Sequence, residues 1–126
     1  MKLNIKNETG RLKSVVLGQP KSIGPVPTLE ESYDAKSYYS IENGIYPKEE
    51  DIIAEMTAFE KVLKKYDVEV FRPNIIKDYN QVFARDVAFV IEDKMIISNV
   101  IKDRADEQEA YRKIFEKVEC RKIINL

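Results

Sequence analysis

The pattern of hydrophobic and polar positions predicts one well-defined helix in the first half of the chain. Pro47 opens this helix, acidic residues follow directly, and lysines gather towards the other end, which is the distribution that the helix dipole favours. The apolar residues recur at spacings of four, three and four, so they share one face: Ile52, Met56, Phe59 and Leu63.

Short apolar runs on either side of this helix predict strands. "RLKSVVLGQP" (residues 11–20) reads as a strand that Gly18 and Pro20 end, and "DVEVFRPN" (67–74) as a second strand that a proline ends. "DVAFVIEDKMIIS" (86–98) predicts a hairpin turning at residues 92–94. Since residues 87–91 are apolar at every position, we expect that strand to be buried on both faces.

The last third of the chain returns to helical spacing and then to a strand pattern. "DRADEQEAYRKIFEKV" (103–118) predicts a helix with Tyr111, Ile114, Phe115 and Val118 on one face, and "CRKIINL" (120–126) opens a further strand. Residues 21–47 show no periodicity and predict a long loop, a feature that is often functional in compact domains. The result is a single α/β domain, residues 1–126, whose two helix-bearing stretches have a similar plan.

The charge balance argues against two classes of partner. The 21 basic and 22 acidic residues nearly cancel and form no block of like charge, so we expect neither a nucleic-acid nor a membrane-surface partner. No apolar run approaches the roughly 20 residues that span a bilayer, and the first residues carry no secretory signal pattern. A single cysteine suits a reducing cytoplasm, where we expect the protein to reside.

The chain lacks the commonest residues of enzyme active sites. It contains no histidine, no metal-ligand cluster and no glycine-rich phosphate loop, so we expect no cofactor and no metal. Cys120 is flanked by the charged residues Glu119 and Arg121, and the chain has no histidine to activate it. We interpret it as an incidental thiol.

One charged pair stands out, Arg85 and Asp86, at the head of the apolar segment. A fixed carboxylate matches the paired N–H donors of a guanidinium, so Asp86 is a candidate ligand for an arginine-like substrate. Arg85 could bind a substrate carboxylate. An ion pair at the strand edge, or a contact with a helix end, is the structural alternative for both residues.

The order of blocks along the chain resembles a known family. "TGRLKSVVLGQP", "VEVFRPN", "FARDVAFVIEDKMIIS" and "RADEQEAYRKIFEKV" together resemble the N-terminal part of the pentein superfamily of guanidino-group-modifying enzymes. The resemblance is greatest to the glycine and inosamine-phosphate amidinotransferases, with "ARD" similar to their "PRD" block. It covers most of the chain, and residues 21–46 match only loosely.

The resemblance implies a pseudo-five-fold propeller of ββαβ units, of which this chain would form about two. It also implies that Asp86 contacts the guanidinium of arginine or a related compound, with Arg85 beside it and residues 21–46 helping to cover the site. The family's nucleophilic cysteine and its histidine have no counterpart here, so we expect an N-terminal fragment of a longer enzyme with no catalytic residue in this chain. The alternatives are a fragment of an arginine deiminase or dimethylarginine hydrolase, and a non-catalytic module that self-associates as a homo-oligomer.

Overall fold

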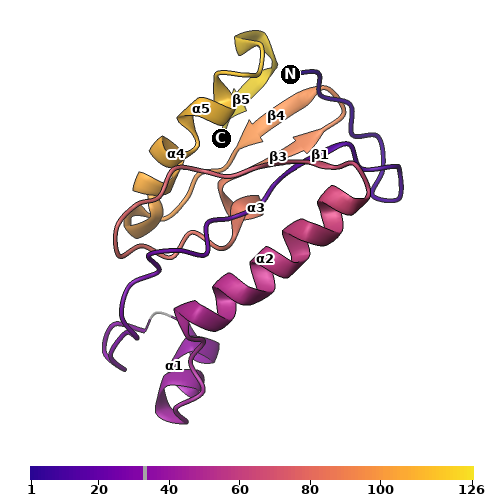
Figure 1. The fold of residues 1–126 in the computed structure, drawn as a ribbon. Helices are drawn as coiled ribbons and strands as arrows, with labels where there is room; N and C mark the ends of the chain where they lie inside the picture. Colours follow the sequence, from indigo (N-terminus) through magenta and orange to yellow (C-terminus); the bar gives the residue numbers. More distant parts are fainter. Residues whose placement is uncertain (33) are drawn as a thin grey trace.

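The computed structural model describes residues 1–32 and 34–126, which form a mixed α/β structure (Figure 1). The first half contains strand β1 (Ser14–Val16), helices α1 (Ala35–Glu42) and α2 (Glu49–Lys65), and strand β2 (Glu69–Phe71). The second half contains the short helix α3 (Ala84–Val87), strands β3 (Ala88–Ile91) and β4 (Lys94–Ile97), the 3-10 turn η1 (Lys102–Arg104), helices α4 (Asp106–Ala110) and α5 (Arg112–Phe115), a second 3-10 turn η2 (Cys120–Lys122), and strand β5 (Ile123–Asn125).

The strands of the described residues form two small open sheets, β1–β2 and β3–β4–β5. Strand β1 is parallel to β2, with Val15 opposite Val70, and α2 connects them. Strand β4 is parallel to β5, with Ile96 opposite Ile124, and α4 and α5 connect them; β3 adds an antiparallel neighbour on the other side of β4. The α/β prediction and the similar plan of the two helix-bearing stretches are therefore confirmed.

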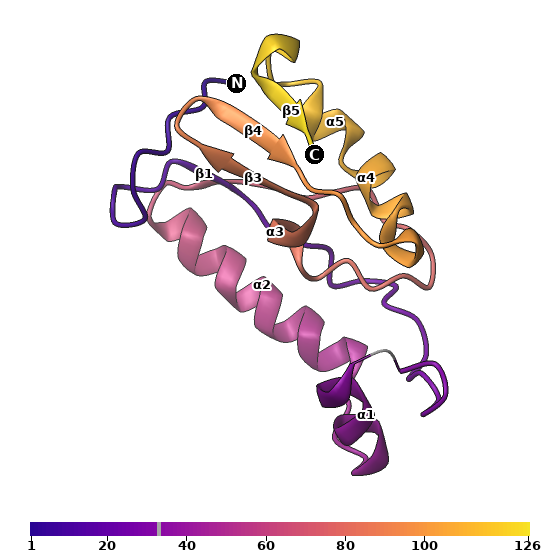
Figure 2. The same ribbon diagram turned by 180° about the vertical axis from the view of Figure 1, so that it is seen from behind.

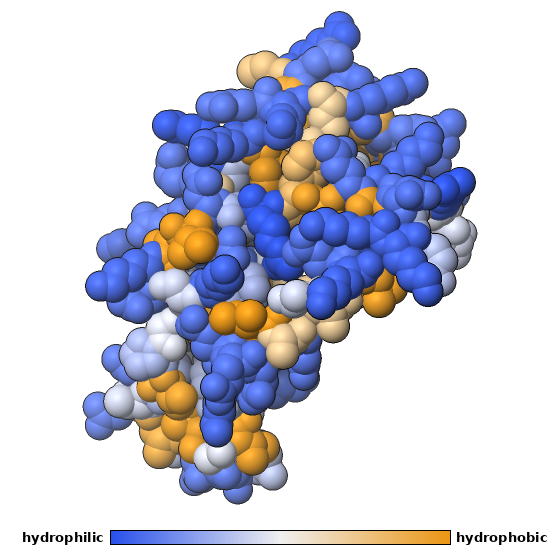
Figure 3. Space-filling model, in the orientation of Figure 1, coloured by the Kyte–Doolittle hydropathy of each residue, from blue (hydrophilic) through white to orange (hydrophobic). Residues whose placement is uncertain are grey.

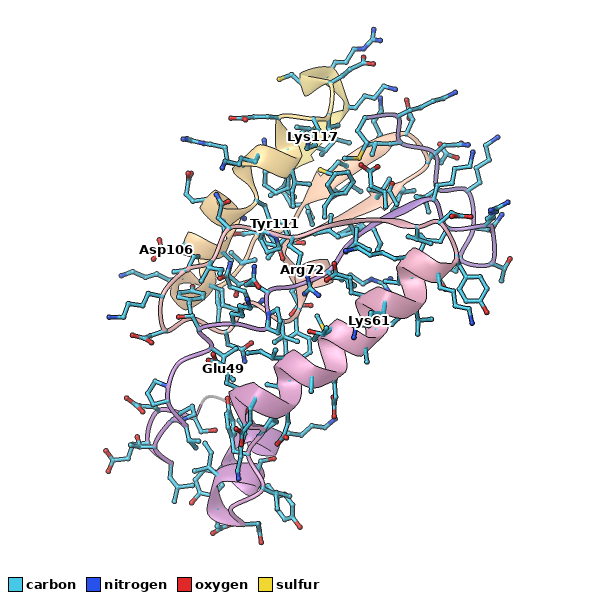
Figure 4. All side chains as sticks on the ribbon, in the orientation of Figure 1. Glu49, Lys61, Arg72, Asp106, Tyr111 and Lys117 are labelled. Carbon is cyan, nitrogen blue, oxygen red and sulfur yellow. The ribbon has the colours of Figure 1, made fainter. Side chains whose placement is uncertain are left out.

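Helix α2 lies on one side of the strands, and α4 and α5 lie on the other side (Figures 1 and 2). Arg72, at the end of β2, attaches α2: its Nε and NH2 both donate to Glu60 Oε2, at 3.0 and 2.7 Å. Arg72 also donates to the backbone carbonyl of Gly18. Figure 4 shows Arg72 between α2 and the strands. No residue of α2 is fully buried, and Phe59 is 50% exposed, so the predicted apolar face is only partly covered.

Two adjoining hydrophobic clusters form the core. Val87, Ala110, Tyr111 and Ile114 form the first cluster, against which residues of β1 and β2 pack. Leu3, Met95 of β4 and Val118, three residues after α5, form the second cluster. Phe115 packs against both clusters. Of the helical face predicted within residues 103–118, Tyr111, Ile114 and Val118 are buried, and Phe115 packs against them.

The prediction of a loop over residues 21–47 is wrong in part, because Ala35–Glu42 form helix α1. Asp34 caps this helix: its Oδ1 accepts hydrogen bonds from the backbone N–H groups of Lys36 and Ser37, at 3.0 and 2.9 Å. No residue of α1 is buried, so no apolar periodicity marked it in the sequence. In both views α1 lies beyond the first turn of α2, away from α3, and hydrophobic residues gather on the surface there (Figures 1, 2 and 3).

The helix predicted over residues 103–118 is interrupted at Tyr111. The carbonyl of Ala110 accepts a hydrogen bond from the backbone N–H of Asn74 at 2.9 Å, and the N–H of Ile114 turns to the carbonyl of Tyr111 at 2.8 Å. A contact distant in sequence therefore replaces one helical bond. The predicted burial of residues 87–91 also holds only at one end, since Val87 is fully buried and Ile91 is 53% exposed.

The described helices include none that is long and apolar enough to cross a membrane.

Gly18 lies where the end of β1 meets the segment that leads to α3. A Cβ atom at this position would lie 2.0 Å from the carbonyl oxygen of Val82 and 2.4 Å from that of Gln81. Next to it, the backbone N–H of Gln19 donates to the carbonyl of Gln81 at 2.9 Å. Only glycine permits this close approach of two backbones.

We therefore expect Gly18→Ala to lower the free energy of unfolding by about 3 kcal/mol, because the methyl group would force the two backbones apart. Urea unfolding followed by circular dichroism measures this change. Gly44→Ala is the matched control: the new Cβ would meet open space, and the positive φ of 65° there predicts a cost of only about 1 kcal/mol. Equal stability of the two variants would contradict the close approach.

Candidate functional site

Arg85 and Asp86 lie on α3, a single four-residue helical turn, and β3 begins only at Ala88, two residues later than the sequence predicted. The backbone N–H of Ala88 closes the turn by donating to the carbonyl of Ala84, after which the chain becomes extended. Val87 is fully buried and anchors the turn in the core, while the two charged side chains remain exposed.

The segment before α3 is held by a buried amide, Gln81. Its Oε1 accepts a hydrogen bond from the backbone N–H of Ile76 at 2.8 Å, and its Nε2 donates to the carbonyl of Asn74 at 3.0 Å. Because Gln81 is fully buried, these hydrogen bonds are shielded from water, and they fix the loop that leads to α3.

Arg85 and Asp86 take different ion-pair partners. Arg85 NH2 lies 3.8 Å from Glu8 Oε1, in a pair whose side chains are 84% and 88% exposed. Asp86 Oδ2 accepts a hydrogen bond from Arg104 NH1 at 2.7 Å. Both residues therefore form ion pairs ahead of β3, in agreement with the structural alternative, and Asp86 contacts the last residue of η1.

Arg104 is itself held by Glu107. Its Nε donates to Oε1 of Glu107 at 2.7 Å and its NH2 donates to Oε2 at 2.8 Å, a bidentate pair. Glu107 is fully buried, so a paired cation is required there. The hydrogen bonds to Glu107, opposed by burial and reinforced by Asp86, raise the pKa of Arg104 above its usual value, and the guanidinium remains protonated.

The sequence did not predict this cluster, because Arg104 and Glu107 lie in a run of charged residues that is typical of an exposed helix. Others in this run are exposed: Glu109 pairs with Arg112 on the surface, at 3.5 Å. A signal was present: Glu107 precedes Tyr111 by four residues and Ile114 by seven, so helical spacing placed it on the buried face.

The cluster of Asp86, Arg104 and Glu107 combines two carboxylates with one guanidinium, a net charge of −1. Glu107 already neutralises Arg104, so Asp86 retains charge that the cluster does not compensate. The Asp86 side chain is 52% exposed, and its Oδ1 accepts no hydrogen bond from the described residues. It can therefore accept hydrogen bonds from a cation in solution.

Tyr111 lies behind the cluster, and its hydroxyl has no hydrogen-bond partner among the described residues. Burial, and next the charge of Glu107, raise the pKa of this hydroxyl. Tyr111 also lines a largely apolar cavity of about 610 Å³, bounded by β1, β3 and the first residues of the chain. Arg85 borders that cavity, whereas Asp86 does not, so the two predicted site residues face different surroundings.

Cys120 is exposed at the start of η2 and lines a different depression, beside Gln108 and Glu109. Within residues 1–32 and 34–126, no group of three or more side chains of the metal-binding types could hold a metal ion.

Comparison with known proteins gives a likeness in structure and none in sequence. No protein-family model matches the chain, and no curated protein sequence matches it. The solved structure of SxtG, an amidinotransferase from Microseira wollei in the saxitoxin biosynthetic pathway, matches with a TM-score of 0.63 at 20% sequence identity. The match covers 91% of this chain and 38% of that chain, so this chain spans less than half the length of the solved enzyme.

The structural match confirms, at the level of fold, the resemblance to amidinotransferases that the sequence suggested. The match covers 91% of this chain, so nearly the whole chain has a mixed α/β fold like that of the corresponding part of the solved enzyme.

Proposed function

We propose that this chain is the N-terminal portion of a cytoplasmic, amidinotransferase-like enzyme that acts on arginine or a related guanidino compound. The observation that carries the proposal is Asp86, a half-exposed carboxylate with an available oxygen in a cluster of net negative charge, on a fold like that of an amidinotransferase. The proposed role of Asp86 is to bind the substrate guanidinium.

The chemistry of the cluster suits this ligand. A guanidinium is planar, permanently charged and weakly hydrated, and it presents parallel N–H donors to a carboxylate. Charge-assisted hydrogen bonds of this kind are about twice as strong as neutral ones. Arg104 forms a bond of this kind with Asp86 Oδ2 at 2.7 Å, which supports the proposed role of the carboxylate as an acceptor for guanidinium N–H donors.

In the proposed full enzyme, further ββαβ units complete a propeller, and a cysteine and a histidine outside this chain carry the covalent step. The thiolate attacks the guanidinium carbon, the amine of the substrate leaves with a proton, and the amidino group remains bonded to sulfur. An acceptor amine such as glycine then takes the amidino group and the thiolate is restored. In a deiminase or a dimethylarginine hydrolase, ammonia or dimethylamine would leave instead, and water would then attack the thiouronium carbon to release citrulline and restore the thiolate.

The expected result for Asp86→Asn in the full protein is a fall of about 100-fold in kcat/KM for arginine, because the variant loses the charge that holds the guanidinium. Formation of ornithine and of citrulline from arginine, measured with and without glycine, gives the rate and separates transfer from deimination. Asp93→Asn is the matched control, because Asp93 is 51% exposed and pairs with Lys94 and Lys122. The kcat/KM of this variant for arginine should remain within about twofold of that of the unaltered protein.

A coding sequence beyond Leu126 that encodes no downstream histidine and cysteine would overturn the proposal. So would an Asp86→Asn variant with the activity of the unaltered protein.

Arg85 has a separate expected effect, because it could bind the carboxylate of arginine. We expect Arg85→Gln to raise KM for arginine about tenfold and to leave KM for agmatine, which lacks that carboxylate, unchanged. Since Arg85 is 84% exposed and lies 3.8 Å from Glu8, the substitution should not affect stability. An equal change for both compounds would remove Arg85 from substrate recognition.

A self-associating, non-catalytic module is the second candidate, and exposed apolar residues on α2 and at its C-cap favour it. Phe59, Val62 and Tyr66 are 50%, 52% and 67% exposed and recur at helical spacing. Both sheets also have open edges, which a second copy could pair. Under this candidate, sedimentation should detect a closed oligomer that Phe59→Ser dissociates, and a monomer at all concentrations would exclude it.

A further inference from the structure

The structure assigns a positioning role to Arg104, which rests on the proposed function of Asp86. We propose that Arg104, fixed by the buried Glu107, orients the Asp86 carboxylate so that Oδ1 faces the incoming guanidinium. Arg104 would not touch the substrate itself.

The geometry supports this role, because three bonds fix the plane of the Arg104 guanidinium. Two of them go to Glu107, at 2.7 and 2.8 Å, and that carboxylate is fully buried. The third, from NH1 to Asp86 Oδ2 at 2.7 Å, therefore comes from a donor whose position is already determined. A planar donor held in this way selects one orientation of its acceptor, which leaves Oδ1 as the available oxygen.

The bond between Arg104 and Asp86 is not needed to stabilise the buried charge. Glu107 receives a full bidentate partner from Arg104 without any contribution from Asp86. Asp86 is 52% exposed, and an ion pair at such an exposed site adds little stability. Orientation of Asp86 is the effect that this third bond does supply.

Charge gives Glu107 a second influence on the site. With Glu107 ionised, the cluster has a net charge of −1, and a cationic ligand restores neutrality. Replacing Glu107 with glutamine makes the cluster neutral, because Arg104 then compensates Asp86 alone. The charge of Arg104 would thus reduce the attraction of Asp86 for a second guanidinium, although residue 107 cannot contact the ligand.

The test compares four variants of the full protein with the unaltered protein: Glu107→Gln, Arg104→Lys, Asp86→Asn and the control Glu109→Gln. Isothermal titration with L-arginine gives Kd, and steady-state assays separate KM from kcat. Glu107→Gln should raise Kd and KM about tenfold with a smaller effect on kcat. The reason is that the proposed contact between Asp86 and the substrate guanidinium is present in both the ground state and the transition state. Arg104→Lys keeps the charge and can pair with Glu107, but a compact ammonium cannot span both carboxylates, and we expect Kd to rise about fivefold.

Glu109→Gln is the matched control, since it makes the same change of charge on the same helix. Glu109 is 73% exposed and pairs with Arg112 on the surface, so arginine affinity should stay within about twofold. Circular dichroism establishes which variants fold, and if Glu107→Gln does not fold, Arg104→Lys decides the matter.

Each outcome has a defined meaning. Unchanged or tighter arginine binding by the folded variants overturns the positioning role, and tighter binding would show that Arg104 competes with the substrate. A loss of binding in Asp86→Asn alone, with Glu107→Gln and Arg104→Lys unaffected, preserves the proposed function and removes only this inference. No arginine binding by the unaltered protein would remove both.

Discussion

Burial of the Glu107 carboxylate is the constraint on which the candidate site depends. A charge without access to water is very costly unless it is paired and hydrogen-bonded, so Arg104 must lie where both oxygens can be reached. Arg104 belongs to the turn before α4, and its remaining donor lies beside α3. One buried acid therefore determines how a cation, a helical turn and an exposed carboxylate are arranged.

A second constraint joins the two halves of the chain. No hydrogen-bonded strand pair links the two sheets of the described residues, so their relative position depends on other contacts. The close approach at Gly18, the bond from Gln19 to Gln81, and the packing of Val16 and Phe71 against the Tyr111 cluster provide these contacts. The same junction holds the segment that leads to α3, so the packing of the two halves also places Asp86.

The sequence predicted most of the regular elements because their apolar spacing is set by local geometry. The α2 helix, the hairpin after Asp86 and the final strand all follow from it. Helix α1 could not be predicted in this way, since it buries no residue, and its only mark was a capping aspartate. The interruption at Tyr111 depends on the backbone of Asn74, a contact that no local pattern encodes.

The site was predictable in part for a similar reason. Asp86 could be chosen because a charge next to an apolar run is conspicuous and because the surrounding blocks resemble those of a known family. Its true partner could not, since Arg104 is 18 residues away and its role depends on the burial of Glu107. Helical spacing indicated that burial, but a glutamate next to Asp106, Gln108 and Glu109 looks solvated until the fold is known.

The hydrogen-bonding capacity of Asp86 sets a limit on what this cluster can do alone. A guanidinium has five N–H donors, and one carboxylate with a single uncommitted oxygen can accept only some of them. The remaining donors of a buried substrate would need acceptors elsewhere, because an unmade hydrogen bond in a closed site is costly. The Asp86 cluster can therefore accept only part of the hydrogen bonds that a guanidinium donates, and a complete guanidinium site requires further acceptors that face Oδ1.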